Sequence, residues 1–485
     1  MCALRRLFSY ATQNQVRTGC LCVCRRKFSV DFVPNLDPSN FKPQKVLILT
    51  KLSRYEFEKR RHPELTEREL ETRLRSRGSD YNMLLYHHYI HKPFSMMEQC
   101  GQCVVPSGMG IFWHHSIRRI PILGLDLLSI KEKNMVYLER GPSGVENTVN
   151  SVFTAAGIET KVVYRFDYSD PNIEWADAIV TTGGDGTFLL AASRVLDRNK
   201  PLIGFNSDPM RSKGKLCLPQ KYSVDVREAI DKLLKGKFRW TFRSRIRVTL
   251  IGDNIYKPPV ELHDQQLLHP EYRYLDIDMQ LRTMEKEVPP CSESGLARRV
   301  LPVLALNEVF IGECVSARVS YLELSFDGSK GIKQKCSGLI ASTGTGSTSW
   351  TYNVNKLTEQ NMEEILTIVK EETGFKIRDS DPLFVRKITN KFNEMLISDA
   401  EVPRMVYTIR DQLVSSPTRS ECFKPRGLAR SIAVKSRCFD ASLVIDGGLS
   451  FTFNDGTRAL LEIYEEDSLR TVTLYEDPTE VSFKH

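Results

Sequence analysis

The sequence has no long apolar run, few cysteines for its length, no internal repeat and no low-complexity tract. Its apolar stretches all stay short of the roughly 18 residues of a membrane-spanning helix, which argues against an integral membrane protein. Twelve cysteines in 485 residues are too sparse for a disulfide scaffold, so we expect free thiols in a reducing compartment. The hydrophobic share of 41% and charged share of 26% are typical of globular domains, of which this length predicts two or three.

The excess of positive charge lies at the beginning of the chain. There are 68 basic and 60 acidic residues in total, but residues 1–30 contain six basic residues and no acidic one. The remainder is nearly neutral, which argues against a large basic surface for nucleic acid. Leu4, Leu7 and Phe8 beside arginines favour a short cationic amphipathic helix, the form of a mitochondrial transit peptide. We therefore expect residues 1–30 to direct the protein to the mitochondrial matrix; the alternative is a disordered basic tail.

Residues 44–220 show the pattern of an α/β nucleotide-binding domain. Apolar runs at 45–50, 179–182 and 201–205 are typical of buried parallel strands. Helices are expected at 53–91, where Pro63-Glu64 opens one, from Val145 onward, and at 187–196. The alternation predicts a doubly wound parallel sheet with helices on its faces. Residues 93–133 lose all periodicity, and we treat them as an atypical insertion.

Residues 221–457 change to β-branched or alternating runs with turns between them. This pattern predicts a second, antiparallel β-rich domain of the β-sandwich type. The expected strands are Trp240–Ile251, Leu301–Gly312, Ala317–Phe326, Gly338–Thr343, Arg404–Ile409, Ser431–Lys435, Ser442–Ile445 and Leu449–Phe453. A polar segment at 252–299 and a helical one at 356–396 interrupt it. We expect the final segment, 458–476, to return to the first domain.

A glycine-rich segment, Gly183-Gly184-Asp185-Gly186-Thr187, follows an expected strand and opens an expected helix. Glycines there allow positive φ and a close approach of the backbone to a ligand. The free N–H groups of a helix N-terminus favour phosphate. An aspartate is a poor phosphate ligand by charge, so its presence indicates a base for a hydroxyl group or a magnesium contact. The alternative is a tight turn between strand and helix.

Two further polar segments lie in the β-rich half. Asn307-Glu308 interrupts the apolar run VLPVLALNEVFIG, where a buried amide and carboxylate need partners. The alternative is a pair at the end of a strand. Thr343–Trp350 is a loop rich in glycine and hydroxyl groups, suited to the ribose, base edge or phosphates of a nucleotide. For this loop the alternative is a flexible turn capped by its own hydroxyls.

Together these motifs resemble those of the NAD kinase family, especially its mitochondrial members in animals: GGDGT at 183–187, NE at 307–308 and GLIASTGTGST at 338–348. The resemblance implies that Asp185 accepts the proton of the 2′-hydroxyl on the adenosine ribose of NAD. It assigns the ATP phosphates to Gly183, Gly184, Gly186 and Thr187. It further assigns Asn307 to the adenine side of NAD, Glu308 to ribose hydroxyls, and Thr345 and Ser347 to the same dinucleotide pocket.

The chain departs from the family pattern at several positions. Ser337 stands where the family has Asp, Gly344 where it has Pro, and Ser349-Trp350 where it has Ala-Tyr. Residues 207–216 (SDPMRSKGKL) replace a short glycine-rich turn. These departures bear on the contacts to the nicotinamide half and the pyrophosphate of NAD, and leave the expected chemistry of Asp185 unchanged.

We expect an enzyme: an ATP-dependent NAD kinase that uses Mg²⁺ with ATP, makes NADP, and has its active site between the two domains. The resemblance implies a homodimer, and the nearly neutral charge beyond residue 30 argues against a nucleic-acid partner. No metal site is expected, because Cys100-Gly101-Gln102-Cys103 has no second ligand pair at zinc spacing. GGDGT also occurs in lipid kinases and phosphofructokinases, so a lipid kinase remains an alternative. A second alternative is a non-catalytic NAD(P)-binding protein.

Overall fold

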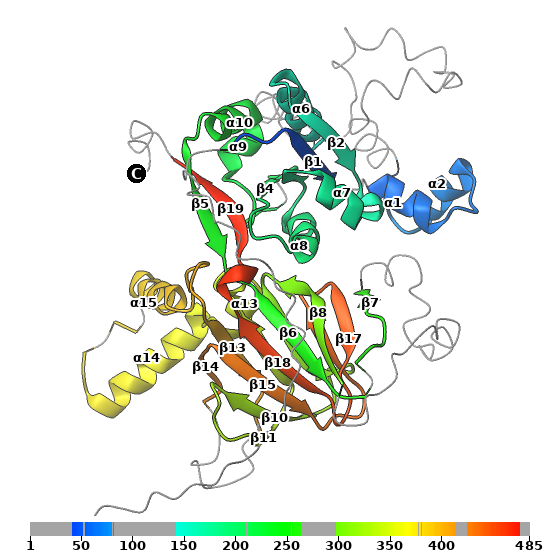
Figure 1. Cartoon of the computed structure of the whole chain (residues 1–485). Helices are drawn as coiled ribbons and strands as arrows, with labels where there is room; N and C mark the ends of the chain where they lie inside the picture. Colours follow the sequence, from blue (N-terminus) through cyan, green and yellow to red (C-terminus); the bar gives the residue numbers. More distant parts are fainter. Residues whose placement is uncertain are drawn as a thin grey trace, which may run out of the picture. The chain divides into compact units, whose positions relative to one another are not determined.

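The computed structural model describes residues 41–51, 54–79, 81, 142–209, 212–253, 255–262, 297–376, 378–379, 381–413 and 424–475 (Figure 1). The expected transit peptide, the expected insertion at 93–133 and the Cys100–Cys103 pair lie outside these ranges. The described residues all belong to one compact unit that begins at Pro38. None of the helices in these ranges has the length and apolar character that a membrane crossing requires.

The first half of the described chain forms a four-stranded parallel sheet of order β2-β1-β3-β4. Its strands are β1 (Lys45–Thr50), β2 (Glu159–Val163), β3 (Ala178–Thr182) and β4 (Leu202–Phe205). The three strands β1, β3 and β4 are buried along almost their whole length, because helices cover both faces of the sheet. The predicted parallel α/β sheet is confirmed.

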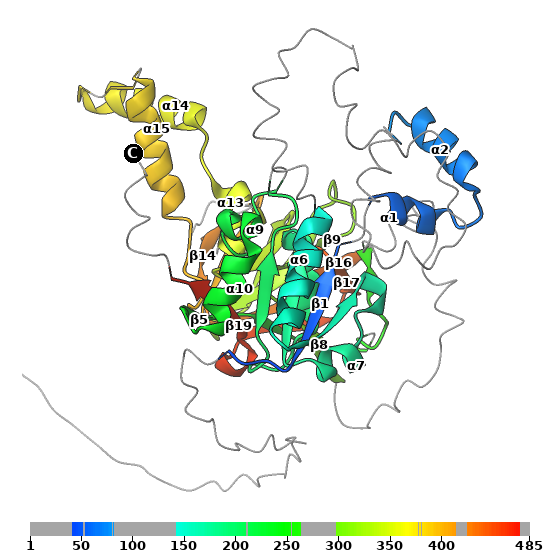
Figure 2. The same cartoon turned by 90° about the horizontal axis from the view of Figure 1, so that it is seen from above.

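Helices cover the two faces of this sheet. One face carries α6 (Pro142–Ala155), α9 (Gln220–Val224) and α10 (Val226–Leu234), and the other carries α7 (Asp170–Trp175) and α8 (Asp185–Arg194). Side chains alternate along β1, so Val46 and Ile48 pack with α6 and α10, whereas Leu47 and Leu49 pack with α7 and α8. Figure 2 shows α6 and α10 beside each other over β1. Since α10 follows residue 220, this core extends beyond the expected domain boundary.

A two-stranded antiparallel sheet adds to the same core. It pairs β5 (Phe238–Arg243) with β19 (Leu469–Leu474). Phe238 and Leu474 pack with the α6 and α10 face of the parallel sheet, and Leu469 packs with the α8 face. The final segment of the chain therefore returns to this core through β19.

Two antiparallel sheets pack around a second apolar core, as predicted. The six-stranded sheet has the order β11-β10-β15-β18-β6-β8, with β6 (Ile246–Ile251), β8 (Arg298–Ala305), β10 (Ser320–Phe326), β11 (Ile332–Cys336), β15 (Ser431–Ser436) and β18 (Arg458–Ile463). The seven-stranded sheet has the order β14-β13-β12-β9-β16-β17-β7, with β7 (Val260–Glu261), β9 (Glu308–Glu313), β12 (Gly338–Ser342), β13 (Met405–Arg410), β14 (Arg426–Ala429), β16 (Ala441–Ile445) and β17 (Leu449–Thr452).

Two of the runs expected as single strands are each divided between sheets. The run Trp240–Ile251 breaks at Ser244-Arg245 into β5 and β6, and Leu301–Gly312 breaks at Leu306-Asn307 into β8 and β9. Both breaks carry a buried polar residue with a partner outside its own ladder: the side chain of Arg245 binds Ala192, and the backbone N–H of Asn307 binds Asp446. Apolar patterning alone does not reveal such a change of sheet, because the residues on either side of it are equally buried.

The remaining helices lie outside the two cores. They are α1 (Arg54–Arg61), α2 (Glu67–Ser76), α13 (Trp350–Asn355), α14 (Glu359–Thr373) and α15 (Pro382–Glu394), with 3₁₀ turns η1 (Arg165–Asp167), η3 (Gly346–Thr348) and η5 (Glu465–Asp467). The prediction that Pro63-Glu64 opens a helix is wrong. The helix starts at Glu67 because Thr66 forms a capping box with Glu69.

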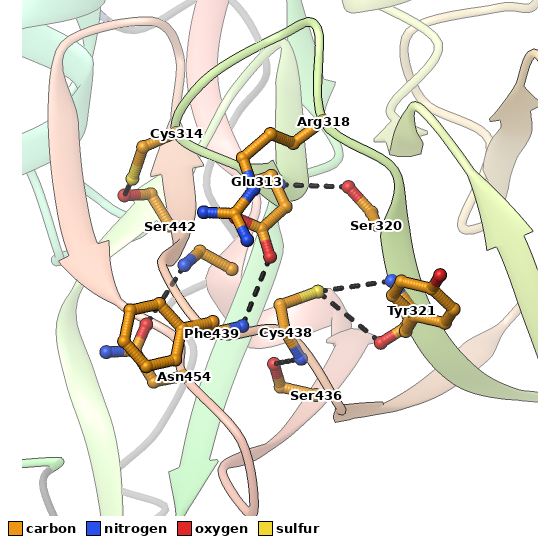
Figure 3. Close-up of polar contacts among 11 residues, drawn as sticks. Glu313, Cys314, Arg318, Ser320, Tyr321, Ser436, Cys438, Phe439, Ser442 and Asn454 are labelled. Atoms are coloured by element: carbon orange, nitrogen blue, oxygen red, sulfur yellow. Dashed lines mark hydrogen bonds and ion pairs between the residues drawn. The ribbon is translucent and has the colours of Figure 1, made fainter.

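Polar contacts join several strands at the end of β9 (Figure 3). Glu313 is buried and accepts a hydrogen bond at 3.1 Å from the N–H of Phe439, while its own N–H donates to Ser320 Oγ at 2.9 Å. The thiol of Cys438 contacts the backbone of Tyr321, and burial raises the pKa of this thiol. The cysteines in the described ranges are all free: Cys217, Cys314, Cys336 and Cys438.

A buried arginine joins the two halves of the described chain. The side chain of Arg245, at the start of β6, is fully buried. Its Nη1 donates to the carbonyl oxygens of Ala192 and Val195 at 3.0 and 2.6 Å, and its Nε donates to that of Asp467 at 2.5 Å. Arg245 therefore caps the C-terminus of α8, where a cation is also favoured by the helix dipole. Burial lowers the pKa of Arg245 to about 10.

We expect Arg245→Ala to destabilise the protein by about 3–5 kcal/mol, because buried carbonyl groups lose their donor. Urea unfolding followed by circular dichroism measures this change. Arg239→Ala is the matched control: it also removes an arginine, but one that is exposed and paired with Glu401. Its cost should stay within about 1 kcal/mol. Equal costs for the two variants would contradict the structural role of Arg245.

Candidate active site

The GGDGT segment connects β3 to α8. Gly183 and Gly184 form the connection, and Asp185 is the first residue of the helix. A side chain at position 183 would meet Thr187 Oγ1 at 2.3 Å, so the close packing of Thr187 requires glycine there. The expectation of positive φ in this segment is wrong, because these glycines are absent from the left-handed region. They act by leaving space at the first turn of α8.

The carboxylate of Asp185 is held by backbone donors. Its Oδ1 accepts a hydrogen bond from the N–H of Leu216 at 2.8 Å, and its Oδ2 accepts one from the N–H of Lys215 at 3.2 Å. Both donors belong to residues 207–216, the segment that departs from the family pattern. Asn206 holds the same segment, because its Nδ2 donates to the carbonyl of Ser212 at 2.7 Å and its side chain fills the space beside Gly214.

Asn307 and Glu308 lie where the chain passes from β8 to β9, and Asp446 holds their backbone. The Asp446 carboxylate accepts hydrogen bonds from the N–H groups of Leu306, Asn307 and Glu308 at 2.8, 2.8 and 3.0 Å. Asp446 and Gly447 have φ of 48° and 65° in the tight turn between β16 and β17. This turn therefore determines where the Asn307 and Glu308 side chains begin.

The side chains of Asn307 and Glu308 have buried atoms without partners. Asn307 Oδ1 and Glu308 Oε2 are both inaccessible to solvent and form no hydrogen bond with any residue that the structure describes. Burial, with a smaller contribution from the charge of Asp446, raises the pKa of Glu308 to about 8. The pKa of Asp446 itself rises to about 6, again through burial. Such unpaired groups are costly in a folded protein unless a ligand satisfies them.

The TGTGST loop follows β12 and rests on the backbone of Asn307. The N–H of Thr343 donates to the carbonyl of Asn307 at 2.9 Å, and a side chain at Gly346 would meet that same oxygen at 2.2 Å. Ser347 is fully buried; its hydroxyl donates to the carbonyl of Gly344 at 2.6 Å and accepts from the N–H of Ser398 at 2.9 Å. The loop and Asn307 therefore form one hydrogen-bonded unit.

Gly344 explains one departure from the family pattern. A side chain at this position would meet the carbonyl oxygen of Asp399 at 1.8 Å. Asp399 belongs to the connection between α15 and β13, which therefore passes directly over the loop. Only glycine leaves room for this approach.

The GGDGT segment and the TGTGST loop meet through two basic residues. Lys215 Nζ donates to the carbonyl of Thr348 at 2.9 Å, and Arg243 Nη1 donates to Thr345 Oγ1 at 3.3 Å. Asp185 also acts on Arg243 through its charge. The structure thus brings together the motifs at 183–187, 307–308 and 343–348.

Sequence reasoning missed Lys215, Arg243 and the role of Asp446. The arginines at 243, 245 and 247 in an expected half-buried strand were a usable signal, because buried arginines need partners. Lys215 and Asp446 had no comparable signal. Among the described residues, no group of three or more His, Cys, Asp or Glu side chains could hold a metal ion.

Trp350, beside the loop, is about one-third exposed, with a relative accessibility of 36%. Its ring meets that of Phe310 edge-on at 5.3 Å, and the Arg410 guanidinium lies 5.6 Å from its centroid. The remaining accessible surface of the ring is available to an aromatic ligand.

The chain is similar to known NAD kinases along most of its length. It is 40% identical over 440 residues to "NAD kinase 2, mitochondrial" of Homo sapiens. The aligned region covers 90% of this chain and 85% of that protein. It is 36% identical over 453 residues to the protein of the same name from Xenopus tropicalis. That alignment covers 90% of this chain and 91% of the Xenopus protein. No family model matches the chain.

Among solved structures, yeast NADH kinase complexed with NADH is similar at a TM-score of 0.44 with 12% identity, covering 94% of each chain. Because this TM-score is low, the family assignment depends on the relatives that are similar in sequence. These relatives exceed 35% identity and span nine-tenths of the chain. The chain therefore belongs to the NAD kinase family.

Proposed function

We propose that the protein transfers the γ-phosphoryl group of ATP to the 2′-hydroxyl of the adenosine ribose of NAD, giving NADP. The observation that carries this proposal is the 40% identity, over 90% of the chain, to "NAD kinase 2, mitochondrial" of Homo sapiens. The arrangement of the three motifs agrees with it. For phosphoryl transfer, a protein must position the reactants, neutralise charge and supply one group that orients the nucleophile.

Asp185 is the group that orients the nucleophile. In this proposal it accepts the proton of the 2′-hydroxyl as that oxygen attacks the γ-phosphorus. Its carboxylate is anchored by two backbone N–H groups, which leaves it little freedom to move away from a bound ribose. Positioning is the main requirement for this base, because the transition state is loose and the proton can leave late.

The ATP phosphates lie at the N-terminus of α8, beside Gly183, Gly184, Gly186 and Thr187. The first N–H groups of a helix have no partner within the helix, and they attract anions. Apart from its chain neighbours, no side chain of the described residues lies within 4 Å of where a Cβ of Gly186 would stand, so a phosphate has access there. Mg²⁺ enters with ATP, since proteins usually bind it through one or two carboxylates and the substrate phosphates. Asp185 offers such a carboxylate.

NAD lies against the NE motif and the TGTGST loop. Asn307 and Glu308 each present a buried oxygen without a partner, suited to the amine of adenine and to ribose hydroxyls respectively. Thr345 completes this side of the pocket through its hydroxyl and its backbone. Because the Ser347 hydroxyl already bonds to Gly344 and Ser398, Ser347 serves the pocket by fixing the shape of the loop.

A single coupled assay separates this proposal from its alternatives. Purified protein with Mg-ATP is offered NAD or diacylglycerol as acceptor, and NADP or the phosphorylated lipid is measured. NADP formation supports the NAD kinase. Phosphorylation of the lipid would indicate a GGDGT lipid kinase, and no turnover with measurable NAD binding would indicate a non-catalytic protein.

The protein is further proposed to work as a homodimer in the mitochondrial matrix. The names of its relatives include "mitochondrial", and residues 1–30 have the composition of a transit peptide. The homodimer follows from the family resemblance alone. Light scattering of the purified protein measures its mass against the 55.5 kDa of one chain.

We expect Asp185→Asn to separate binding from catalysis. Asn keeps the size of the side chain but cannot take the proton, so turnover should fall by about 10²–10⁴. Affinity for NAD should change by less than about tenfold. Steady-state kinetics and calorimetry measure the two effects, with Asp231→Asn on the exposed face of α10 as the control. Turnover above a third of the wild-type value would make Asp185 a structural residue.

Binding of NAD should release protons near pH 7. The pKa of Glu308 is about 8 in the free protein, so the group is mostly neutral there. Ribose hydroxyls that donate to Glu308 favour its ionised form, so up to about one proton should leave per NAD bound. Calorimetry in two buffers of different ionisation enthalpy measures the release. Glu308→Gln should abolish the release and raise the KM for NAD; identical enthalpies for the wild type would refute the assignment.

The same pKa predicts how stability depends on pH. The pKa of Glu308 is higher in the folded protein than in the unfolded chain, where it is near the ordinary 4.5. Its contribution to stability is therefore complete below about pH 4.5 and is lost as the pH rises through about 8. Between pH 6 and pH 9 the wild type should lose more stability than Glu308→Gln, as measured by urea unfolding.

Residues 1–40 fused to a fluorescent reporter should enter the matrix of isolated mitochondria. Replacement of Arg5, Arg6, Arg25 and Arg26 by Gln removes the positive charge of the expected helix, and import should then be lost. Protection of the reporter from added protease measures import. Undiminished import of the substituted fusion would exclude a transit peptide of this kind.

A further inference from the structure

We propose that Arg243, whose guanidinium binds Thr345 of the TGTGST loop, binds the phosphoryl group during its transfer. This inference rests on the proposed function and adds to it a residue outside the three motifs. It predicts that the guanidinium contacts the oxygens of the γ-phosphoryl group and the bridging oxygen whose bond to the γ-phosphorus breaks.

The position of Arg243 is rigid. It is the last residue of β5 and pairs with Leu469 of β19. The N–H of the preceding Phe242 donates to the Glu401 carboxylate at 2.8 Å, and that of the following Ser244 donates to the carbonyl of Ala400 at 2.8 Å. Fixed backbone on both sides of a residue is what precise placement of a charged group requires.

The guanidinium of Arg243 has few partners for a partly buried cation. Its Nη1 donates to Thr345 Oγ1 at 3.3 Å, whereas its Nε is inaccessible to solvent and unpaired. Within the described part of the chain, Arg243 has no carboxylate at ion-pair distance. Asp185, Asp399 and Glu401 act on it only through the longer-range attraction of their charges. A partly buried cation without a close anion is costly, so the arrangement favours an anionic ligand.

Neighbouring arginines on the same stretch of chain are paired differently. Arg239 pairs with Glu401 at 3.3 Å, and Arg247 pairs with Asp467 at 2.6 Å. Arg245 donates three hydrogen bonds to backbone carbonyls. Each of these three has an evident structural role. Arg243 has a single hydrogen bond, and that bond leads to Thr345 of the TGTGST loop.

The location of Arg243 suits the chemistry of transfer. The 2′-oxygen forms a bond to the γ-phosphorus while the bond from that phosphorus to the bridging oxygen breaks, and the electron pair leaves with ADP. The proton of the hydroxyl goes to Asp185. Negative charge on the phosphoryl oxygens and the leaving oxygen is met by a planar guanidinium, which can donate two parallel hydrogen bonds. Arg243 also offsets the repulsion between Asp185 and the phosphates.

Three variants test the assignment. Arg243→Met keeps the aliphatic stem without the charge, Arg243→Lys keeps the charge without the planar fork, and Arg239→Gln is the control from the same strand. Arg243→Met should lower kcat by about 10²–10³, the usual effect of removing one donor from a developing anion. Its KM for NAD should change less than threefold. Arg243→Lys should recover part of the loss, and Arg239→Gln should behave as the wild type.

Two readouts distinguish phosphate binding from a structural role. Loss of a partly buried cation without a close anion should leave the melting temperature unchanged or higher, whereas loss of a structural arginine lowers it. Inorganic tripolyphosphate should raise the melting temperature of the wild type, and this rise should shrink at least fivefold in Arg243→Met. The second readout needs no turnover, so it remains decisive even if the wild type fails to phosphorylate NAD.

A kcat of Arg243→Met within threefold of the wild type would overturn the proposal. An unchanged response to tripolyphosphate would overturn it as well. A lower melting temperature that accounts for the whole loss of activity would assign Arg243 to the structure. Failure of the wild type in the NAD assay, with the tripolyphosphate response lost in Arg243→Met, would refute the proposed acceptor and retain the phosphate site.

Discussion

The guanidinium of Arg245 takes the place of the water that would otherwise hydrate the last carbonyl groups of α8. It binds Ala192 and Val195 of that helix region and Asp467 of the turn before β19. The helix whose first residue is Asp185 is thereby attached, at its other end, to the β-rich part of the chain. A fully buried cation is costly to leave unpaired, so the three hydrogen bonds of Arg245 depend on one another. This side chain therefore helps to hold α8 at the start of β6, together with the apolar contacts that α8 makes with Leu306 and Leu469.

Asp446 performs a similar function for the opposite wall of the site. Its carboxylate binds three successive N–H groups, so the chain can leave one sheet at Leu306 and enter another at Glu308. The protein satisfies the backbone at this crossing and leaves Asn307 Oδ1 and Glu308 Oε2 without partners. Unpaired side chains on a well-anchored backbone are what a binding surface needs, since the ligand can then supply the missing hydrogen bonds.

The sequence was informative where periodicity and motif agree, and uninformative where a single residue redirects the chain. The parallel strands and the helix after GGDGT follow from apolar runs of the right length. The breaks at Arg245 and Asn307 do not, because flanking residues on both sides are buried and a change of sheet leaves no periodic signature. The three motifs were recognisable from short stretches of sequence. That Lys215 and Arg243 join them depends on contacts between residues more than a hundred positions apart, which no local pattern encodes.

Gly344 and the segment after α15 constrain one another. The Asp399 carbonyl occupies the space of a side chain at position 344, and Ser398 donates its N–H to Ser347 of the same loop. The loop and the helical insert formed by α14 and α15 are therefore a matched pair. A loop with proline at position 344 would collide with this backbone, and an insert that followed another path would leave Ser347 without its donor. A chimera between members of this family would have to exchange both segments together.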